Sequence, residues 1–433
     1  MRARLASYDR TMTTETTLPT VSADDVDLSD IEFWLADRVE REAGFKALRD
    51  APGLRFFPES TLEGSPFPPG PGYWALVRHE DVWAASRNPQ LFCSGKGSNI
   101  VDLPQELNEF FGSMINMDDP KHYRLRTLVA KGFTPKEVAR VEQYVIEQAK
   151  TVVDRMLERH PDGSCDFVEA IAAPLPLGII CEMMGIPAED HERIFQWTNV
   201  ILGIGDPEYG GTYEALMQVS LDMFAYAQAL GESRRAHPTD DLTSVLMAAE
   251  VDGEQLSSQE FGSFFILLVV AGNETTRNAI SHGMKALTDH PDQREWWFDN
   301  FEATTKTAVE ELVRWATPVI HFRRTATADT ELGGQAIAEG GKVVLWYASA
   351  NRDERVFADP HRFDVTRPLQ PGQVGFGAGG PHFCLGANLA RREITVMFDE
   401  IRRRLPNLRI TGEPAYLESF FINGIKRLAC AWD

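Results

Sequence analysis

The longest helical pattern in the chain runs over residues 257–290. Within it, hydrophobic residues recur every three or four positions, as in a helix with one buried face: Phe261, Phe264, Phe265 and Leu268. The pattern is interrupted at residues 271–276, Ala-Gly-Asn-Glu-Thr-Thr, where polar side chains enter an apolar run. A glycine inside a helix costs about 1 kcal/mol relative to alanine. The break predicts either a local opening that holds a small polar group or, as is usual for an isolated Glu-Thr-Thr, an exposed helix surface.

Shorter patterns predict further helices and a small sheet. Helical spacing recurs in residues 31–49, 81–86, 135–158 and 385–405. A helix start is indicated by Asp119 followed by Pro120. Short β-like runs are found at residues 54–57, 73–77 and 343–347. The predicted fold class is therefore mainly α with a small β region (α+β).

No linker rich in Gly, Ser or Pro divides the 433 residues, so we expect a single domain over residues 29–433. Residues 1–28 are rich in Thr, Ser and Asp and are predicted to form a disordered tail, within which Met12 is a second candidate start. An aromatic and apolar stretch, residues 194–202, ends just before Gly203. We expect this stretch to act as a mobile lid.

The net charge of the chain is -21, which argues against a general affinity for nucleic acid or anionic lipid. The longest strongly apolar run, residues 264–272, is far shorter than the roughly 20 residues that span a bilayer. The 5 cysteines lack the C-x-x-C spacing of zinc or iron–sulfur sites. We therefore expect a cytoplasmic protein without a membrane span, and we expect it to be a monomer.

The most unusual stretch is residues 376–386, Phe-Gly-Ala-Gly-Gly-Pro-His-Phe-Cys-Leu-Gly, in which glycines surround one cysteine. Glycines allow the backbone to approach a flat ligand closely. The helix predicted to begin after Cys384 directs its first amide groups toward the sulfur, where they would stabilise a thiolate. The stretch therefore indicates a ligand site built around Cys384.

Two other interpretations of this stretch exist. Gly375, Gly377 and Gly380 match the dinucleotide-binding pattern G-x-G-x-x-G, but the acids downstream lie on the predicted helix rather than at the end of a second strand. Alternatively, Cys384 is a small buried hydrophobe, which is the default for a single cysteine. That interpretation leaves the glycines and His382 without an explanation.

The spacing of Gly380, His382, Cys384 and Gly386 resembles the haem-binding loop of the cytochromes P450. Phe376 lies one position further from the cysteine than the aromatic residue usual in that family. The resemblance implies the cytochrome P450 fold, in which a long central helix and the Cys-ligand loop sandwich haem b. It further implies that Cys384 ligates the iron and that the neighbouring cofactor contacts are Phe376, Gly377, His382 and Gly386.

The polar break in the long helix also resembles a P450 feature, the oxygen-binding groove. The matching residues are Ala271 and Gly272, which would face the cofactor, and Glu274 and Thr275. In the family the acid and the threonine relay protons to O2. The resemblance therefore implies that Glu274 and Thr275 are the catalytic residues.

Three basic residues match the partners of the two haem propionates in the family: His122, Arg126 and Arg324. His122 and Arg126 are four positions apart and therefore share one face of a helix. From the residues alone, this pair is as well explained by a solvated charged face. The resemblance favours the propionate role.

Glu311 and Arg314 form the E-x-x-R pair of the resembled family. Their spacing of three places both side chains on one helical face, and an exposed pair of this kind would contribute little stability. In the family, an arginine from a later segment joins the pair and locks the backbone behind the haem. We expect that arginine to be Arg362.

These elements imply a haem-thiolate monooxygenase that inserts one atom of O2 into a C–H bond. The chain carries no flavin or iron–sulfur module, so reducing equivalents are expected from NAD(P)H through a ferredoxin reductase and a ferredoxin. A basic docking patch for the ferredoxin is expected from Lys121, Arg124, Lys131, Arg391 and Arg392. The alternatives are a hydrogen-peroxide-dependent peroxygenase, which usually lacks the acid–threonine pair, and a non-catalytic haem-binding or sensing protein.

Four segments are similar to bacterial, especially mycobacterial, members that hydroxylate terminal methyls of branched lipids and sterol side chains: residues 110–115, 197–203, 264–278 and 384–393. This similarity implies omega-hydroxylation of a methyl-branched fatty acid, isoprenoid or sterol side chain. The expected substrate contacts are Phe111, Ile115, Leu202, Leu268, Val319 and Phe421.

Overall fold

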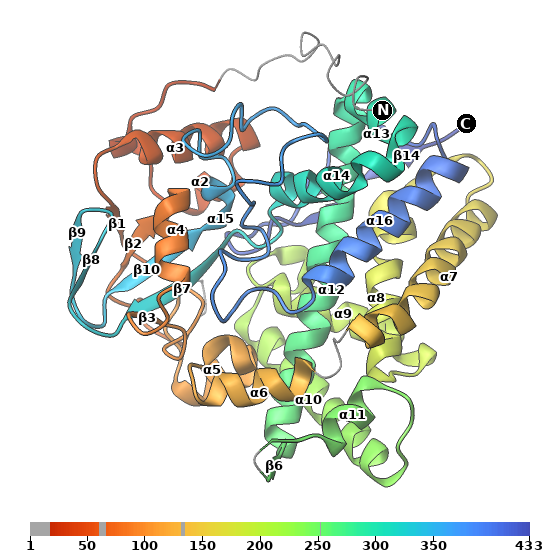
Figure 1. The fold of residues 1–433 in the computed structure, drawn as a ribbon, viewed down its shortest axis with the longest axis horizontal. Coiled ribbons are helices and arrows are strands. Elements are labelled where there is room, and N and C mark those ends of the chain that lie inside the picture. Colours follow the sequence, from red (N-terminus) through yellow and green to blue (C-terminus); the bar gives the residue numbers. More distant parts are fainter. Residues whose placement is uncertain (1–17, 60–65, 131–134, 252) are drawn as a thin grey trace.

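The structure is a computed structural model that describes residues 18–59, 66–130, 135–251 and 253–433. Figure 1 shows a body rich in helices with a small sheet along one side. The α-helices are α2 (Ile31–Leu35), α3 (Arg38–Asp50), α4 (His79–Ser86), α5 (Gln105–Gly112), α6 (Lys121–Ala130), α7 (Pro135–Arg159), α8 (Pro174–Met184), α9 (His191–Leu202), α10 (Tyr213–Ala236), α11 (Leu242–Ala248), α12 (Ser258–Asp289), α13 (Pro291–Asp299), α14 (Phe301–Ala316), α15 (Tyr347–Ala350) and α16 (Ala387–Arg404). The strands are β1 (Arg55–Phe57), β2 (Tyr73–Leu76), β3 (Phe92–Cys93), β4 (Ser164–Asp166), β5 (Glu250–Val251), β6 (Glu254–Gln255), β7 (His321–Ala326), β8 (Thr330–Leu332), β9 (Gln335–Ile337), β10 (Lys342–Trp346), β11 (Arg409–Ile410), β12 (Ala415–Tyr416), β13 (Ile425–Arg427) and β14 (Ala429–Ala431).

Helix α12 passes through the helical body, and α8, α10, α14 and α16 pack against it (Figure 1). It starts with a capping box: the Glu260 N–H donates to the Ser257 hydroxyl (3.1 Å), and the Ser257 N–H donates to the Glu260 carboxylate (3.0 Å). Phe261, Phe264 and Phe265 are buried on it. The prediction of one long, apolar helix over this part of the chain is confirmed.

The main sheet has the strand order β1-β2-β10-β7-β3. Strand β10 lies in its centre, parallel to β2 and antiparallel to β7. All five residues of β10 are buried, which is typical of a strand covered on both faces. In this register Val343 lies opposite both Trp74 and Arg324. The α+β fold class is confirmed.

Two sequence predictions about the first 50 residues need correction. The helix predicted over residues 31–49 is divided into α2 and α3, because the Asp37 carboxylate accepts the Glu40 N–H (2.9 Å) and starts a new helix. Residues 1–17 of the predicted tail lie outside the described residues, but residues 18–28 belong to the fold. Val26 and Leu28 are buried, and the Trp34 indole N–H donates to the Leu28 carbonyl (3.0 Å).

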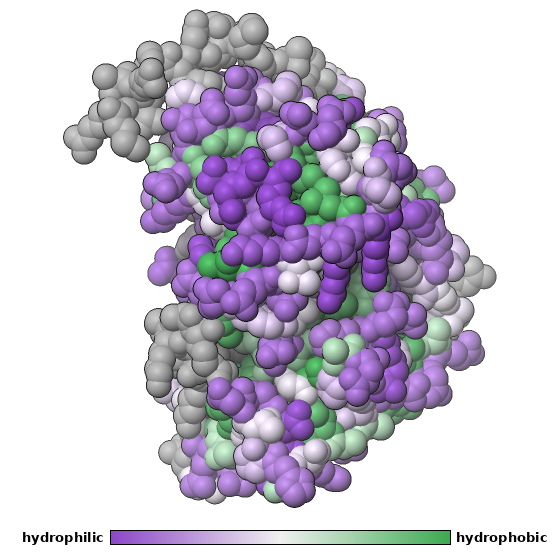
Figure 2. Space-filling model, turned by 90° about the vertical axis from the view of Figure 1, so that its right-hand side faces the viewer, coloured by the Kyte–Doolittle hydropathy of each residue, from purple (hydrophilic) through white to green (hydrophobic). Residues whose placement is uncertain are grey.

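The surface around α7, α13 and α16 is predominantly polar. Figure 2 shows hydrophilic residues over most of this face, with hydrophobic residues in separate small areas between them. None of the helices in the described part of the chain is long and apolar enough to cross a membrane.

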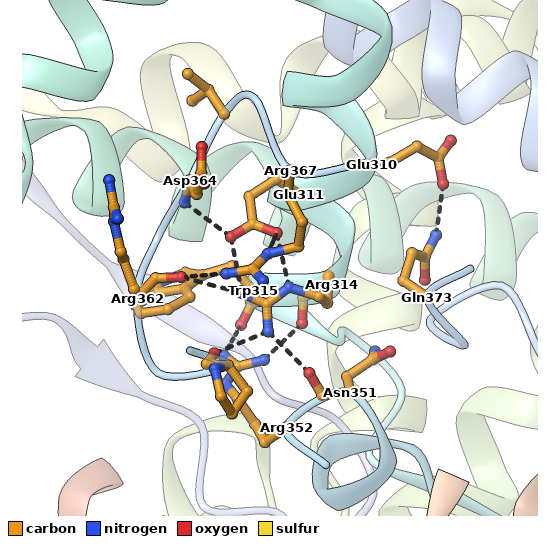
Figure 3. Close-up of polar contacts among 12 residues, drawn as sticks. Glu310, Glu311, Arg314, Trp315, Asn351, Arg352, Arg362, Asp364, Arg367 and Gln373 are labelled. Carbon is orange, nitrogen blue, oxygen red and sulfur yellow. Dashed lines mark hydrogen bonds and ion pairs between the residues drawn. The ribbon is translucent and has the colours of Figure 1, made fainter. Parts of the chain in front are cut away.

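Buried charges hold the end of α14 to the segment that follows β10. The Arg314 guanidinium binds the Glu311 carboxylate through two hydrogen bonds (2.6 and 2.7 Å), and neither side chain is exposed by more than 1%. Arg314 also donates to the carbonyls of Asn351 (2.8 Å) and Pro360 (2.9 Å). Figure 3 shows these contacts converging on Arg314 from three parts of the chain.

The third charged residue at this site is Arg367, and the prediction of Arg362 is wrong. The Arg367 Nε donates to the Glu311 carboxylate (3.0 Å). Arg362 contributes only its backbone carbonyl, which accepts from the Arg367 guanidinium (2.8 Å), and Figure 3 shows its side chain extending away from Glu311. The turn at Asp359, where the backbone has a φ of 47°, and the following bends bring the later arginine back to α14.

We expect Arg367→Ala to destabilise the protein by at least about 2 kcal/mol, because it leaves part of a buried carboxylate unpaired. The matched variant Arg362→Ala should cost under about 1 kcal/mol, as its side chain makes no ion pair within the described residues. Urea unfolding followed by circular dichroism measures both values. An equal loss in the two variants would contradict the assignment of Arg367.

Candidate active site

A cavity lies between α12 and the loop that precedes α16. Residues from α6, α8, α14 and β7 complete its wall. Most of the wall is apolar, and polar side chains are concentrated near Cys384. The lining residues are Met114, Ile115, His122, Arg126, Ile180, Phe264, Leu267, Leu268, Ala271, Gly272, Thr275, Thr276, Ala279, Val313, Pro318, Val319, Phe322, Tyr347, Gly375, Phe376, Gly377, His382, Phe383, Cys384, Leu385, Gly386, Leu389, Ala390, Glu393 and Ile394.

The polar break of α12 opens onto this cavity. Ala271, Gly272 and Thr275 all line it. The Thr275 hydroxyl donates to the Ala271 carbonyl one turn earlier (2.9 Å), so its oxygen retains acceptor capacity toward the cavity. The interpretation of residues 271–276 as a simple exposed surface is therefore wrong for these three residues.

Glu274 does not line the cavity. It is 1% exposed, and its carboxylate pairs with Arg277 and accepts from the Asn278 amide (3.2 Å). The Arg277 guanidinium in turn donates to the Asn199 side chain of α9 (2.9 Å). The second Glu274 oxygen, Oε2, has no hydrogen-bond partner among the residues that the structure describes. Contacts that lead through Arg277 to α9 therefore hold the Glu274 carboxylate in place, and its Oε2 atom remains able to accept a hydrogen bond.

Cys384 is held by a loop with unusual backbone angles. Gly377 and Gly380 have φ values of 94° and 77°, a region that favours glycine. A Cβ on Gly380 would lie 2.2 Å from the Ser86 carbonyl oxygen. The Cys384 N–H donates to the Phe376 carbonyl (3.0 Å), which closes the loop. These constraints explain the glycines that the sequence places before the cysteine.

The Cys384 sulfur is subject to opposing electrostatic effects. Burial raises the pKa of its thiol, whereas the N–H groups of Gly386 and Ala387 and the guanidinium groups of Arg126 and Arg391 lower it. In the protein alone, burial has the larger effect. A bound metal ion deprotonates a coordinating thiol outright, so the donors around Cys384 suit a metal-bound thiolate.

Basic and polar groups gather at one edge of the cavity. His122 and His382 both line it, with ring centroids 4.3 Å apart, and burial lowers both pKa values, that of His382 to about 2. The His122 Nε2 atom is buried and has no hydrogen-bond partner in the described part of the chain. The Arg126 guanidinium donates to the Phe383 carbonyl (2.6 Å). Arg324 lies behind this edge on β7 and donates to the Arg323 carbonyl (2.7 Å).

These groups fit haem. Among the described residues, no carboxylate pairs with Arg126 or Arg324, although the chain carries a net charge of -21. A flat apolar molecule with two carboxylates would place its ring in the apolar cavity and its charges on this basic edge. A Cβ on Gly386 would meet no protein atom within 4 Å, so the space beside it belongs to the cavity. The soft sulfur of Cys384 supplies an iron ligand.

Three of the six expected substrate residues line the cavity: Ile115, Leu268 and Val319. The other three do not. Phe111 packs against Phe110 (ring centroids 5.1 Å apart), Phe421 packs against Phe322 (5.7 Å), and Leu202 ends α9.

The comparison with known proteins decides the family. A cytochrome P450 family model matches residues 303–405. A Mycobacterium tuberculosis protein named methyl-branched lipid omega-hydroxylase is 54% identical over 415 residues, which cover 96% of each chain. The chain belongs to the cytochrome P450 family. It is therefore a P450 monooxygenase, an enzyme class that uses haem, O2 and reducing equivalents.

Two further relatives place this P450 among bacterial members. A Rhodococcus jostii steroid C26-monooxygenase is 44% identical over 362 residues, which cover 82% of this chain and 74% of that protein. A solved structure of a Mycobacterium marinum cytochrome P450 in complex with pseudoionone has a TM-score of 0.89 and 42% identity, covering 96% of this chain and 100% of that one.

The candidate lid of this P450 is attached to the hairpin formed by β12 and β13. Residues 194–202 form part of α9, and the loop after them contains Asp206, which is fully buried. Its carboxylate accepts from the Lys426 ammonium (2.8 Å) and the Glu418 N–H (3.0 Å). The motion of this segment remains a prediction, and its position depends on these contacts.

The expected basic docking patch is largely neutralised. Carboxylates pair with its four described members: Lys121 with Glu109, Arg124 with Glu260, Arg391 with Glu310, and Arg392 with Glu142. Lys131 lies outside the described residues. The four described members therefore do not form a patch of unpaired positive charges.

Sequence reasoning missed Glu393, a buried acid of α16 that lines the cavity. One of its oxygens, Oε2, has no hydrogen-bond partner within the described residues, and burial alone raises the pKa of this carboxyl group to about 8. A signal was present in the helical pattern. Leu389, Ile394 and Met397 mark the buried face of the helix, and Glu393 is an acid within that apolar stripe.

We expect the stability of this P450 to fall between pH 5 and 8 because of Glu393. The native state keeps the proton up to about pH 8, whereas the unfolded chain releases it near the ordinary glutamate pKa of 4.5. The raised pKa therefore gives a contribution that is full below pH 4.5 and is lost as pH rises through 8, by about 1.4 kcal/mol per pH unit.

Glu393→Gln should remove this pH dependence of the free energy of unfolding, which urea unfolding measures. The infrared carbonyl band of a protonated carboxyl group at pH 7 should also be absent in this variant. Met397→Leu, a buried change on the same helix, should shift stability equally at every pH. The same pH slope in wild type and Glu393→Gln would show that Glu393 is ionised in the native state.

Proposed function

We propose that this P450 hydroxylates the terminal methyl group of a methyl-branched fatty acid, isoprenoid or sterol side chain, with electrons supplied by a ferredoxin. The observation that carries the proposal is the largely apolar cavity at Cys384, whose wall contains Ile115, Leu268 and Val319 together with the polar break of α12. The names of the 54% and 44% identical relatives support a branched lipid or a steroid as the substrate class.

In this proposal, Cys384 would ligate the iron, and His122, Arg126 and His382 would hold the cofactor's carboxylates, with Arg324 behind them. Phe376, Gly377 and Gly386 of the loop and Ala271 and Gly272 of α12 would contact the ring. When bound, haem supplies the activation of O2 and the oxidation of the C–H bond. The protein's task is to orient the substrate, admit protons and exclude other water.

Thr275 and Glu274 are proposed to supply the protons. The Thr275 oxygen can accept from a water in the cavity, and by turning away from Ala271 its hydroxyl can donate in the opposite direction. The Oε2 of Glu274, which has no partner among the described residues, leaves one carboxylate oxygen able to take up and release a proton. Arg277 holds the other oxygen in place.

The ferredoxin is proposed to dock over the loop that carries Cys384. Phe383, next to the ligand, is 36% exposed there, and an open depression beside it is lined by Trp83, Phe376 and Arg391. Since the cations of this surface are paired with carboxylates, packing of apolar groups contributes more to docking than charge attraction.

Thr275→Ala should bind haem and substrate nearly normally but divert reducing equivalents to hydrogen peroxide. Loss of the positioned hydroxyl should lower product formed per NADH by about tenfold or more. Thr288→Ala is the matched control, because Thr288 makes the same hydrogen bond one turn back on α12 (2.9 Å to Met284) and does not line the cavity.

Product and peroxide are measured together with NADH consumption, using a ferredoxin and its reductase. Unchanged coupling in Thr275→Ala would remove Thr275 from the proton relay. Turnover with hydrogen peroxide alone, at the rate of the reconstituted system, would favour a peroxygenase instead.

A methyl-branched fatty acid should bind more tightly than a straight-chain acid of equal carbon number and should yield mainly the terminal alcohol. A terminal C–H bond is stronger than its neighbours, so only a narrow approach can direct oxidation there. The blunt branched end also buries more apolar surface, and each Å2 buried contributes about 25 cal/mol to the free energy of binding.

Leu268→Ala should widen the approach and move part of the product to subterminal positions. Leu287→Ala, a buried change on the same helix outside the cavity, should lower stability without moving the product. Mainly subterminal products from both acids in the wild type would refute the proposed regiochemistry while leaving the monooxygenase assignment intact.

A further inference from the structure

Two cysteines face each other in the small sheet β11-β14-β4, which lies outside the candidate active site. Cys165 of β4 and Cys430 of β14 are direct partners in the antiparallel register, and their sulfur atoms are 3.5 Å apart. Both are free thiols. Cys165 is partly exposed, whereas Cys430 is 1% exposed.

The backbone around this pair suits a disulfide bond. Phe167 donates to the Leu428 carbonyl (2.8 Å) and Trp432 donates to the Gly163 carbonyl (3.0 Å), which are the positions two residues on either side. Because hydrogen-bonded pairs alternate along an antiparallel ladder, Cys165 and Cys430 form such a pair, with a Cα–Cα distance of about 5.5 Å. Disulfides occur at Cα–Cα distances of about 4.4–6.8 Å. The two side chains also leave the same face of the sheet.

We propose that Cys165 and Cys430 are a reversible modification site that a low-molecular-weight disulfide converts from two thiols into one cross-strand disulfide. The proposal is independent of the function proposed above, since neither cysteine lines the cavity. Their adjacency across two strands that are distant in sequence is the observation that carries it.

The order of the two steps follows from exposure. The Cys165 thiolate attacks one sulfur of the small disulfide, forms a mixed disulfide and releases one small thiol. The Cys430 sulfur then attacks Cys165 and releases the second small thiol. Overall, two protein thiols lose two electrons and two protons, and one small disulfide is reduced to two thiols.

The electrostatic setting agrees with Cys165 as the attacking group. The hydrogen bond with Cys430 lowers the pKa of the Cys165 thiol, and the same contact raises the pKa of Cys430. Burial and the nearby carboxylates of Asp162, Asp166 and Glu169 act against a thiolate at Cys165. These negative charges also repel anionic oxidants, so a neutral disulfide is the suitable probe.

The remaining cysteines are poor alternatives. Cys93 and Cys181 are buried, and burial raises both pKa values, that of Cys181 to about 12. Cys384 lies in the cavity, where the proposed function assigns it to the iron. Cys93 lies opposite Thr325 in its sheet, and Cys165–Cys430 is the sulfur–sulfur contact found within the described residues.

The disulfide would join the C-terminal strand to the segment before the π-helix η4 (Val168–Ala172), which packs on α12. The two cysteines are 265 positions apart, so the bond closes a long loop in the unfolded chain. We expect the oxidised protein to unfold at a temperature several degrees higher. Its C-terminus should also resist carboxypeptidase.

The test uses the full-length holoenzyme and bis(2-hydroxyethyl) disulfide at pH 8. Peptide mapping without reductant should show one cross-linked species that joins the peptides of Cys165 and Cys430, and dithiothreitol should remove it. A lasting mixed disulfide at Cys165 in the wild type, or the absence of modification at both residues, would overturn the proposal.

Single variants test the order of the steps. Cys430→Ala should retain a mixed disulfide at Cys165, and Cys165→Ser should leave Cys430 unmodified. Cys93→Ser, the matched control, should form the cross-link as the wild type does. The rise in unfolding temperature should occur in wild type and Cys93→Ser alone, and the same rise in Cys165→Ser would assign it to another cause and contradict the proposal.

Discussion

The buried ion pair of Glu311 and Arg314 is the interaction on which the candidate active site depends. A buried guanidinium needs partners for all of its donors, and here they are provided by backbone carbonyls from the segment after β10. One of them belongs to Asn351, whose side-chain oxygen accepts the Val374 N–H (2.8 Å). The Val374 carbonyl then accepts the Gly377 N–H (2.9 Å). This series of hydrogen bonds connects the ion pair on α14 to the loop that positions Cys384.

Helix α12 combines two tasks that have opposite requirements. Its apolar residues pack against the surrounding helices, whereas residues 271–277 need polar partners inside a buried helix. Those partners come largely from α9: Thr198 accepts from the Asn273 amide (3.0 Å) and Asn199 accepts from Arg277 (2.9 Å). The acid of the proposed proton relay is therefore fixed by the candidate lid itself, because Thr198 and Asn199 lie within residues 194–202 of α9. If α9 moves as the predicted lid, its contacts with Asn273 and Arg277 would change, and substrate access would then be coupled to the geometry around Glu274.

The sequence was sufficient for features whose signal is local. The hydrophobic period predicted helix α12, and the glycines predicted the loop before Cys384. The E-x-x-R spacing predicted that Glu311 and Arg314 share one helical face. Features that depend on distant partners were missed. Arg362 and Arg367 are both arginines in the same loop, and only the path of the chain selects Arg367. The basic patch failed because its carboxylate partners, such as Glu142 and Glu310, come from other helices. Val26 and Leu28 are isolated apolar residues in an acidic stretch, where no hydrophobic periodicity indicates that they are buried.

The five cysteines show how position decides the chemistry of one side chain. Cys93 and Cys181 sit in apolar surroundings that disfavour the thiolate, and they serve as packing residues. Cys384 lines the cavity, where helix N–H groups and two guanidinium groups oppose the effect of burial on its pKa. At Cys165 the opposing group is another thiol, supplied by strand register. Burial thus disfavours ionisation at each of these sites, and the donors that face the sulfur distinguish the buried packing residues from the proposed iron ligand and the proposed exchanging thiol.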